Sequence, residues 1–110
     1  MAFVPQPRNV EVIRSGAGHL LVRGVLTFRT ARFAYEAGLR LLKKDAKGNA
    51  FTEIDCGDVT ESDSAGLAVL IEWLAAAGRA GQHVRYANLP EGIRATAEIS
   101  DVTSLLESGV

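Results

Sequence analysis

The stretch from Phe51 to Arg79 constrains the fold of this chain more than any other. It opens with the run Phe51–Cys56, whose β-branched and aromatic residues fit a central strand. An acidic, hydroxyl-rich turn follows, and from Ser64 onward the apolar residues recur at helical spacing, as in Leu67, Leu70, Ile71 and Leu74. A strand that passes through one turn into an amphipathic helix is the repeating unit of parallel α/β sheets.

The residues before this stretch predict a hairpin and a helix. Val10–Arg14 and His19–Leu26 have strand character, and the glycine-containing turn between them favours antiparallel pairing. From Ala31 to Lys44 the spacing becomes helical, and Thr30 is the expected N-cap.

The residues after it predict one more strand and one more helix. The strand is expected over His83–Asn88, and Pro90 suits the first position of a helix that reaches Glu98. Val102, Leu105 and Leu106 suggest a short amphipathic tail that closes over the sheet. The whole order predicts an α/β fold: a mixed sheet of four to five strands, an N-terminal antiparallel hairpin, βαβ units, and helices packed on the sheet.

Length and charge narrow the classes of function. The 110 residues suit one domain, expected over residues 10–110 after a lead-in of residues 1–9. The net charge of −1 comes without a basic tail, which argues against nucleic acid as the main partner. The sequence shows no signal peptide, and no window approaches the roughly 18 apolar residues of a membrane span. We therefore expect a cytoplasmic protein without direct membrane insertion.

Ser64 is the strongest candidate for a modified or partner-binding residue. A helix start carries unpaired backbone N–H groups and a partial positive charge, so a phosphate on Ser64 or a carboxylate from a partner would be well received there. The alternative is structural, because serine at a helix start is an ordinary N-cap. Residue chemistry alone leaves both interpretations open.

Four carboxylates near Ser64 raise the possibility of a metal site: Asp55, Asp58, Glu61 and Asp63. Their spacing fits no calcium loop, and strand alternation turns some of them apart, so a solvated acidic loop is the better account. Neither histidine accompanies a serine or cysteine in a nucleophile–base arrangement, and Cys56 is expected to be buried. We therefore expect no metal, no cofactor and no catalytic residue.

Trp73 lies off the stripe formed by Leu67, Leu70 and Leu74, on the side of Val69 and Ala76. One interpretation is a second apolar flank that docks a partner, since aromatic anchors mark interfaces. The other is that Trp73 caps the edge of the core with its indole N–H in water.

The motif Asp63-Ser64-Ala65-Gly66, after a strand that ends in Ile54-Asp55-Cys56, resembles the signature of STAS domains. This is the fold of bacterial anti-sigma factor antagonists, which have Asp-Ser-Ser-Gly there and are phosphorylated on the first serine by a partner kinase. Ser64 matches that serine, whereas Ala65 departs from the second one.

Longer runs are similar to the MlaB-type branch of the family, which is the small cytoplasmic subunit of the Mla phospholipid-transport ABC complex. The runs are Gly24–Ala31, Leu70–Leu74, Arg85–Pro90 and Ile99–Val102. This resemblance implies a non-enzymatic accessory subunit, peripheral to an inner-membrane complex, that binds and modulates the ABC ATPase. The implied alternative is an anti-sigma factor antagonist switched by phosphorylation of Ser64 by a serine kinase. The expected partner-binding residues are Asp63, Ser64, Ala65, Gly66, Val69 and Trp73.

Overall fold

The computed structural model describes residues 9–46, 51–99 and 106. In chain order the elements are β1 (Val10–Gly16), β2 (His19–Leu26), α1 (Ala31–Ala46), β3 (Phe51–Ser62), α2 (Ser64–Arg79), β4 (His83–Ala87) and α3 (Glu91–Ile99). This order confirms the predicted α/β fold. The predicted lead-in through residue 8, and Val102 and Leu105 of the tail, lie outside the described residues, while Leu106 is buried in the core.

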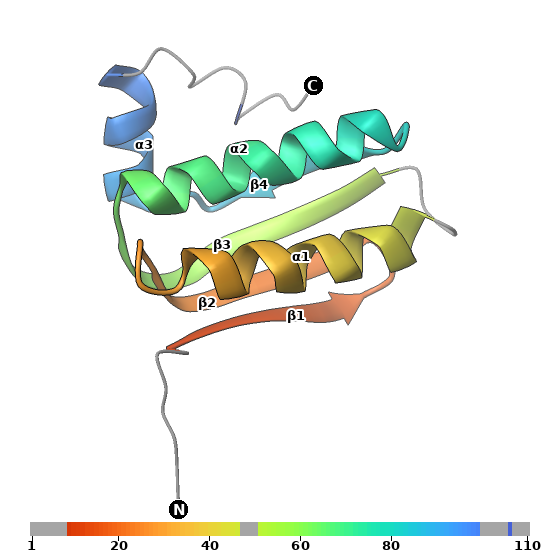
Figure 1. Cartoon of the computed structure of the whole chain (residues 1–110), viewed down its shortest axis with the longest axis horizontal. Helices are drawn as coiled ribbons and strands as arrows, with labels where there is room; N and C mark the ends of the chain where they lie inside the picture. Colours follow the sequence, from red (N-terminus) through yellow and green to blue (C-terminus); the bar gives the residue numbers. More distant parts are fainter. Residues whose placement is uncertain (1–8, 47–50, 100–105, 107–110) are drawn as a thin grey trace, which may run out of the picture.

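The four strands form one sheet in the order β1-β2-β3-β4. β1 and β2 are antiparallel, and Gly18 turns between them with φ of 72°, a left-handed conformation that suits glycine. β2, β3 and β4 run parallel, each joined to the next by a helix. Both α1 and α2 lie side by side on the same face of the sheet (Figure 1). α3 packs against α2 and β3.

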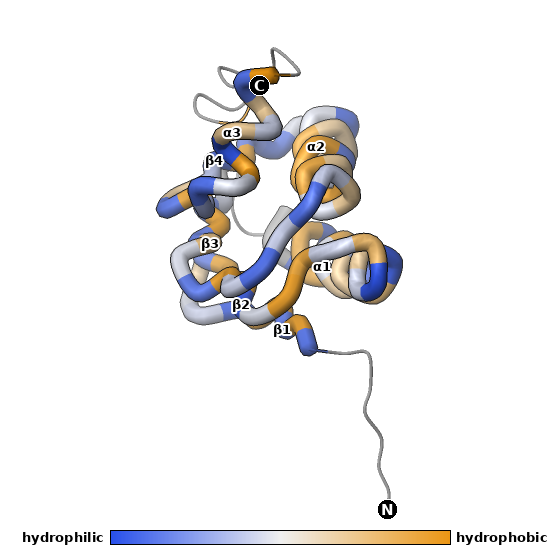
Figure 2. The backbone as a smooth tube through the Cα atoms, turned by 90° about the vertical axis from the view of Figure 1, so that its left-hand side faces the viewer, coloured by the Kyte–Doolittle hydropathy of each residue, from blue (hydrophilic) through white to orange (hydrophobic). Residues whose placement is uncertain are grey.

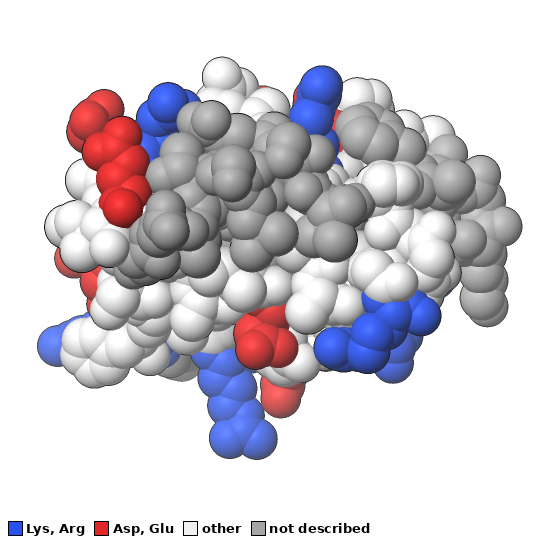
Figure 3. Space-filling model, turned by 90° about the horizontal axis from the view of Figure 1, so that it is seen from above, with Lys and Arg blue, Asp and Glu red and all other residues white. Residues whose placement is uncertain are grey.

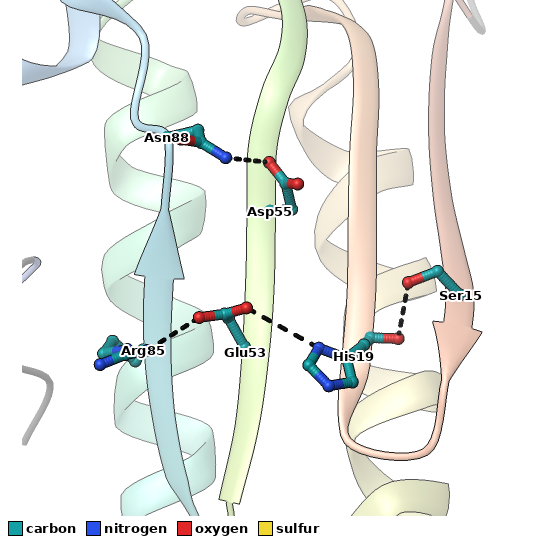
Figure 4. A network of polar contacts seen from close by, with 6 residues as sticks. All are labelled: Ser15, His19, Glu53, Asp55, Arg85 and Asn88. Carbon is teal, nitrogen blue, oxygen red and sulfur yellow. Dashed lines mark hydrogen bonds and ion pairs between the residues drawn. The ribbon is translucent and has the colours of Figure 1, made fainter.

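The core fills the space between the sheet and the two helices. Alternate strand residues point into it, because successive side chains of a strand project to opposite faces. Fully buried examples on the strands are Leu20, Val22 and Ile54, and Leu70 of α2 is fully buried as well. The side view shows the helices on one side of the sheet only (Figure 2). On the other face Glu53 lies between His19 and Arg85, and a second polar pair joins Asp55 to Asn88 (Figure 4).

β3 is longer than the sequence suggested. The segment from Asp58 to Ser62 was expected to be an acidic turn, but it continues the strand and pairs with β2 as far as Leu26↔Ser62. Two register shifts accommodate it. The strand therefore delivers Asp63 directly to the start of α2, at the edge where β2 also ends.

None of the helices in the described part of the chain is both long and apolar enough to cross a membrane.

Candidate functional site

Asp63 ties the start of α2 to the loop between β2 and α1 (residues 27–30). It is the N-cap of α2, and its Oδ1 accepts a hydrogen bond from the Gly66 amide at 3.0 Å. Its Oδ2 accepts a second hydrogen bond from the Phe28 amide at 3.1 Å. The capping role considered for Ser64 therefore belongs to Asp63, because Ser64 is already the first residue of the helix. One carboxylate fixes two loops at the same sheet edge.

Ser64 is the first residue of α2, and its side chain is exposed. No other described residue forms a hydrogen bond with its hydroxyl group. Asp63 already caps the helix, so this hydroxyl is left available at a helix end that carries partial positive charge. The geometry therefore allows a partner or a modifying enzyme to reach Ser64, while its role in binding stays a prediction.

Gly66 lets α2 approach the end of β2 more closely than any side chain would. A Cβ atom at this position would lie 2.2 Å from the backbone oxygen of Leu26. Real Cβ atoms do not come this close to a backbone atom, so steric exclusion explains why this position of the motif is glycine. It sets the distance between the α2 start and the loop that follows β2.

That loop presents an aromatic side chain close to Asp63, the residue before Ser64. Phe28 is 71% exposed, and the Arg29 guanidinium lies 5.7 Å from the centre of its ring. Hydrogen bonds of the buried Thr30 hydroxyl fix the conformation of this loop. The hydroxyl donates to the Val25 carbonyl at 2.7 Å and accepts from the Thr27 amide at 3.1 Å. An exposed aromatic on a fixed loop is a typical interface anchor.

We name this surface the Ser64 edge: Phe28, Arg29, Asp63, Ser64 and Ala65. A polar hollow of about 410 Å³ opens next to it, lined partly by Asn9, Phe28, Glu61 and Asp63. The sequence patterns did not single out Phe28 as a binding residue. The available signal was a large apolar residue in a short polar segment between a strand and a helix.

Trp73 is not part of an exposed flank. It is fully buried, and its indole Nε1 donates to the Tyr35 carbonyl oxygen of α1 at 3.1 Å. The ring packs on Gly38, where a Cβ atom would lie 2.2 Å from it. The interpretation of Trp73 as a docking residue is therefore wrong for this conformation, and so is the interpretation with the indole N–H in water. The flank that looked free on α2 is covered by α1.

Val69 is also buried, at 5% exposure, although it reaches a hollow of about 500 Å³ between α1 and α2. Ala65 and Ala68 line the same hollow from α2. Of the six predicted binding residues, the structure therefore brings Asp63, Ser64, Ala65 and Gly66 together at the start of α2. Val69 lies one turn further along, and Trp73 is inside the molecule.

The four carboxylates do not converge. Asp55 lies on the open face of the sheet, where its Oδ1 accepts from the Asn88 side chain at 3.1 Å and from the Gly57 amide at 2.8 Å (Figure 4). The carboxylate of Asp63 already accepts hydrogen bonds from two backbone amides. Within the described residues no group of three or more His, Cys, Asp or Glu side chains is placed to hold a metal ion.

Cys56 is fully buried in β3, as expected. Burial is the main cause that raises the pKa of its thiol from 9.0 to about 12, and the negative charge of Asp55 adds to it. The neutral thiol is a poor nucleophile and acts here as a small apolar side chain.

Comparisons with known proteins agree with the fold described above. The fold matches the structure of the anti-sigma factor antagonist SpoIIAA in its unphosphorylated form, with a TM-score of 0.59 and 12% sequence identity over 82% of each chain. At this identity the likeness concerns the fold alone. Among curated proteins, none matches the chain.

A family model described as "Mlab, STAS domain" matches residues 11–107, which is nearly the whole chain. The match includes every strand and helix of the described structure except the first residue of β1. The chain belongs to the STAS domain family, of the MlaB type.

Proposed function

We propose that this chain is a non-enzymatic protein-binding module, an accessory subunit that binds the ATPase of an ABC-type phospholipid transporter and modulates it. The MlaB-type family match supports the partner class. The observation that carries the proposal is the Ser64 edge itself, where an exposed hydroxyl and an exposed aromatic ring are held together by Asp63.

The chemistry of the edge favours binding over catalysis. Among the described residues Ser64 has no hydrogen bond to a base, and the Cys56 thiol is buried and neutral. The module would act by preferring one state of the ATPase, because a bound subunit shifts a conformational equilibrium only through unequal affinity for the two states. It works in the cytoplasm, at the periphery of an inner-membrane complex.

Co-purification with the ATPase from the host's own transporter tests this proposal. Ser64→Glu and Phe28→Ala should each weaken the complex at least about tenfold, since they place a charge or remove an anchor at the contact. Arg79→Gln is the control, because Arg79 is exposed and lies at the other end of α2, about 22 Å along the helix axis from Ser64. Binding that survives both edge variants would refute the contact, and absence of binding by the unmodified chain would refute the function.

A second function, anti-sigma factor antagonism switched by phosphorylation, is favoured by the exposed and unengaged Ser64 hydroxyl. A phosphate would add about −1.5 to −2 charge beside Asp63 and close to Glu61, and this charge would repel an acidic partner. Incubation with the cognate serine kinase and ATP should add one phosphate, visible by intact mass. A Ser64→Ala variant should stay unmodified. No mass shift on the unmodified chain would exclude this alternative.

A further inference from the structure

Two hollows follow the line where α1 and α2 lie side by side, a line that we name the α1–α2 seam. The first, of about 500 Å³, is lined by Ala31 and Tyr35 from α1 and by Ala65, Ala68 and Val69 from α2. The second, of about 90 Å³, lies further along both helices, lined mainly by Leu39, Leu42, Ala76 and Ala77. Both are mostly apolar.

The contact between Trp73 and Gly38 separates the two hollows. Trp73 fills the space between the helices there, and because it is fully buried it does not project beyond them. A partner can therefore lie along the seam across this point and insert side chains on either side of it. The exposed positions of α2 nearby are Ala68 and Ala75, which are small, and Glu72.

The α1 side of the seam is strongly basic. Residues 29–46 contain five Lys or Arg and two Asp or Glu, a net charge of +3 in a chain whose total is −1. The five cations are all exposed: Arg29, Arg32, Arg40, Lys43 and Lys44. In the view from above, blue side chains project along the lower edge, which is the helix-covered side, and red side chains lie between them (Figure 3). α2 by contrast has only Glu72 and Arg79 as charged residues.

Two of these cations stand at the hollows. Arg32, which pairs with Glu36 at 3.4 Å, lines the first hollow together with Glu72, and Lys43 lines the second. They are eleven residues apart on one helix, which is close to three full turns and about 16 Å along the axis. Both therefore lie on the same side of α1. A second helix laid along the seam would reach both cations with carboxylates spaced in the same way.

We propose that the α1–α2 seam binds an acidic amphipathic helix of a partner protein. Its apolar side chains would enter the two hollows, and its carboxylates would pair with Arg32 and Lys43, a helix-in-groove mode. This surface adjoins the Ser64 edge, with which it shares Ala65, and the inference holds whether or not that edge binds an ATPase.

Other occupants fit the seam less well. A second copy of this chain would bring one basic α1 against another. An anionic bilayer has no protruding side chains to fill two concave apolar hollows.

Three labelled helical peptides of about 18 residues provide the probe. All three carry the same leucine stripe, flanked by Glu, Gln or Lys, and their binding to the purified chain is followed by fluorescence anisotropy. The Glu peptide should bind at least about tenfold more tightly than the Lys peptide, and its affinity should fall as salt is raised from about 50 to about 300 mM. Equal binding of the Glu and Lys peptides, or no binding of the Glu peptide, would overturn the proposal.

Variants locate the binding. The double variant Arg32→Glu/Lys43→Glu should reverse the preference between the Glu and Lys peptides, and Ala68→Arg should block the first hollow. Arg23→Glu is a matched control on β2, since Arg23, like Arg32, is exposed and paired with one glutamate. All of these sites are exposed, and circular dichroism verifies the fold of each variant. Glu-peptide binding that is insensitive to the seam variants contradicts the proposal.

Vesicles of phosphatidylcholine with about one-third phosphatidylglycerol test the membrane alternative. The chain should stay in the supernatant on sedimentation at about 150 mM salt. Co-sedimentation that Arg32→Glu/Lys43→Glu abolishes, without preferential binding of the Glu peptide, would assign the seam to a lipid surface and overturn the proposal.

Discussion

Replacing Gly38 by alanine tests whether the contact of α1 with Trp73 fixes the packing of the two helices. A Cβ atom at this position would lie 2.2 Å from Cε2 and 2.3 Å from Cζ2 of the indole ring. Carbon atoms prefer a separation of about 3.5–4.0 Å, so the ring or the helix must move by more than 1 Å. The ring is fully buried and held by its bond to Tyr35, so it has little room to move.

Two effects of opposite sign decide the magnitude. Alanine in place of glycine favours a helix by about 1 kcal/mol, because less backbone entropy is lost on folding. Overpacking a filled core costs about 1–3 kcal/mol, and the short contacts place Gly38→Ala at the upper end. We expect a net loss of about 2 kcal/mol in the free energy of unfolding, or about 8 °C in Tm for a chain of this length.

Urea unfolding followed by the fluorescence of Trp73, the sole tryptophan, measures this loss directly. Gly78→Ala in α2 is the matched control, because a Cβ atom there meets nothing within 4 Å. It should raise the free energy of unfolding by about 0.5–1 kcal/mol. An unfolding midpoint for Gly38→Ala equal to or above that of the unmodified chain would refute the reasoning.

Three further predictions concern the Ser64 edge and the core. Asp63→Ala removes both the helix cap and the hydrogen bond from the Phe28 amide, so it should lower the free energy of unfolding in urea by about 2 kcal/mol. Asp63→Asn keeps the cap and should lower it by less; equal losses would contradict the double role of Asp63. Gly66→Ala should destabilise the fold by at least about 2 kcal/mol, because its Cβ meets the Leu26 backbone oxygen, and an unchanged midpoint would show that α2 can shift. The raised pKa of Cys56 means that the folded state holds the thiol proton more tightly than the unfolded state. The contribution of this thiol to stability should therefore be constant below pH 9.0 and fall as the pH rises toward 12, by roughly 2 kcal/mol at about pH 10.5. Burial also raises the pKa of Tyr86, which adds to the fall above pH 10.0; Cys56→Ala should reduce this slope without removing it, and an unaltered slope would contradict the assignment.

Local patterns predicted the elements well. The hairpin, α1 from Ala31 and α2 from Ser64 to Arg79 appear where residue periodicity and turn residues place them. These features depend on neighbours within a few positions of one another, and such neighbours are visible in the sequence. The motif glycine Gly66 and the aspartate Asp63 were also identified, though the close approach and the double hydrogen bond behind them were not.

The end of β3 could not be predicted in this way. Gly57 and Asp58 have low strand propensity and read as a turn, yet pairing with β2 extends the strand to Ser62. Strand pairing joins residues more than thirty positions apart, so propensity within the segment does not decide it.

Residue patterns alone were enough to establish the alternation of strands and helices, the polar and apolar faces of each element, and a serine at the start of α2. What covers each face became clear from the packing of the folded chain. Helical angles place Trp73 off the main stripe of α2, but the crossing of α1 at Gly38 is what buries it. In the same way, folding brings Phe28 to Asp63 across 35 positions of the chain. The physical reason is that periodicity records the direction of a side chain along its own element, whereas burial depends on which other element packs against it.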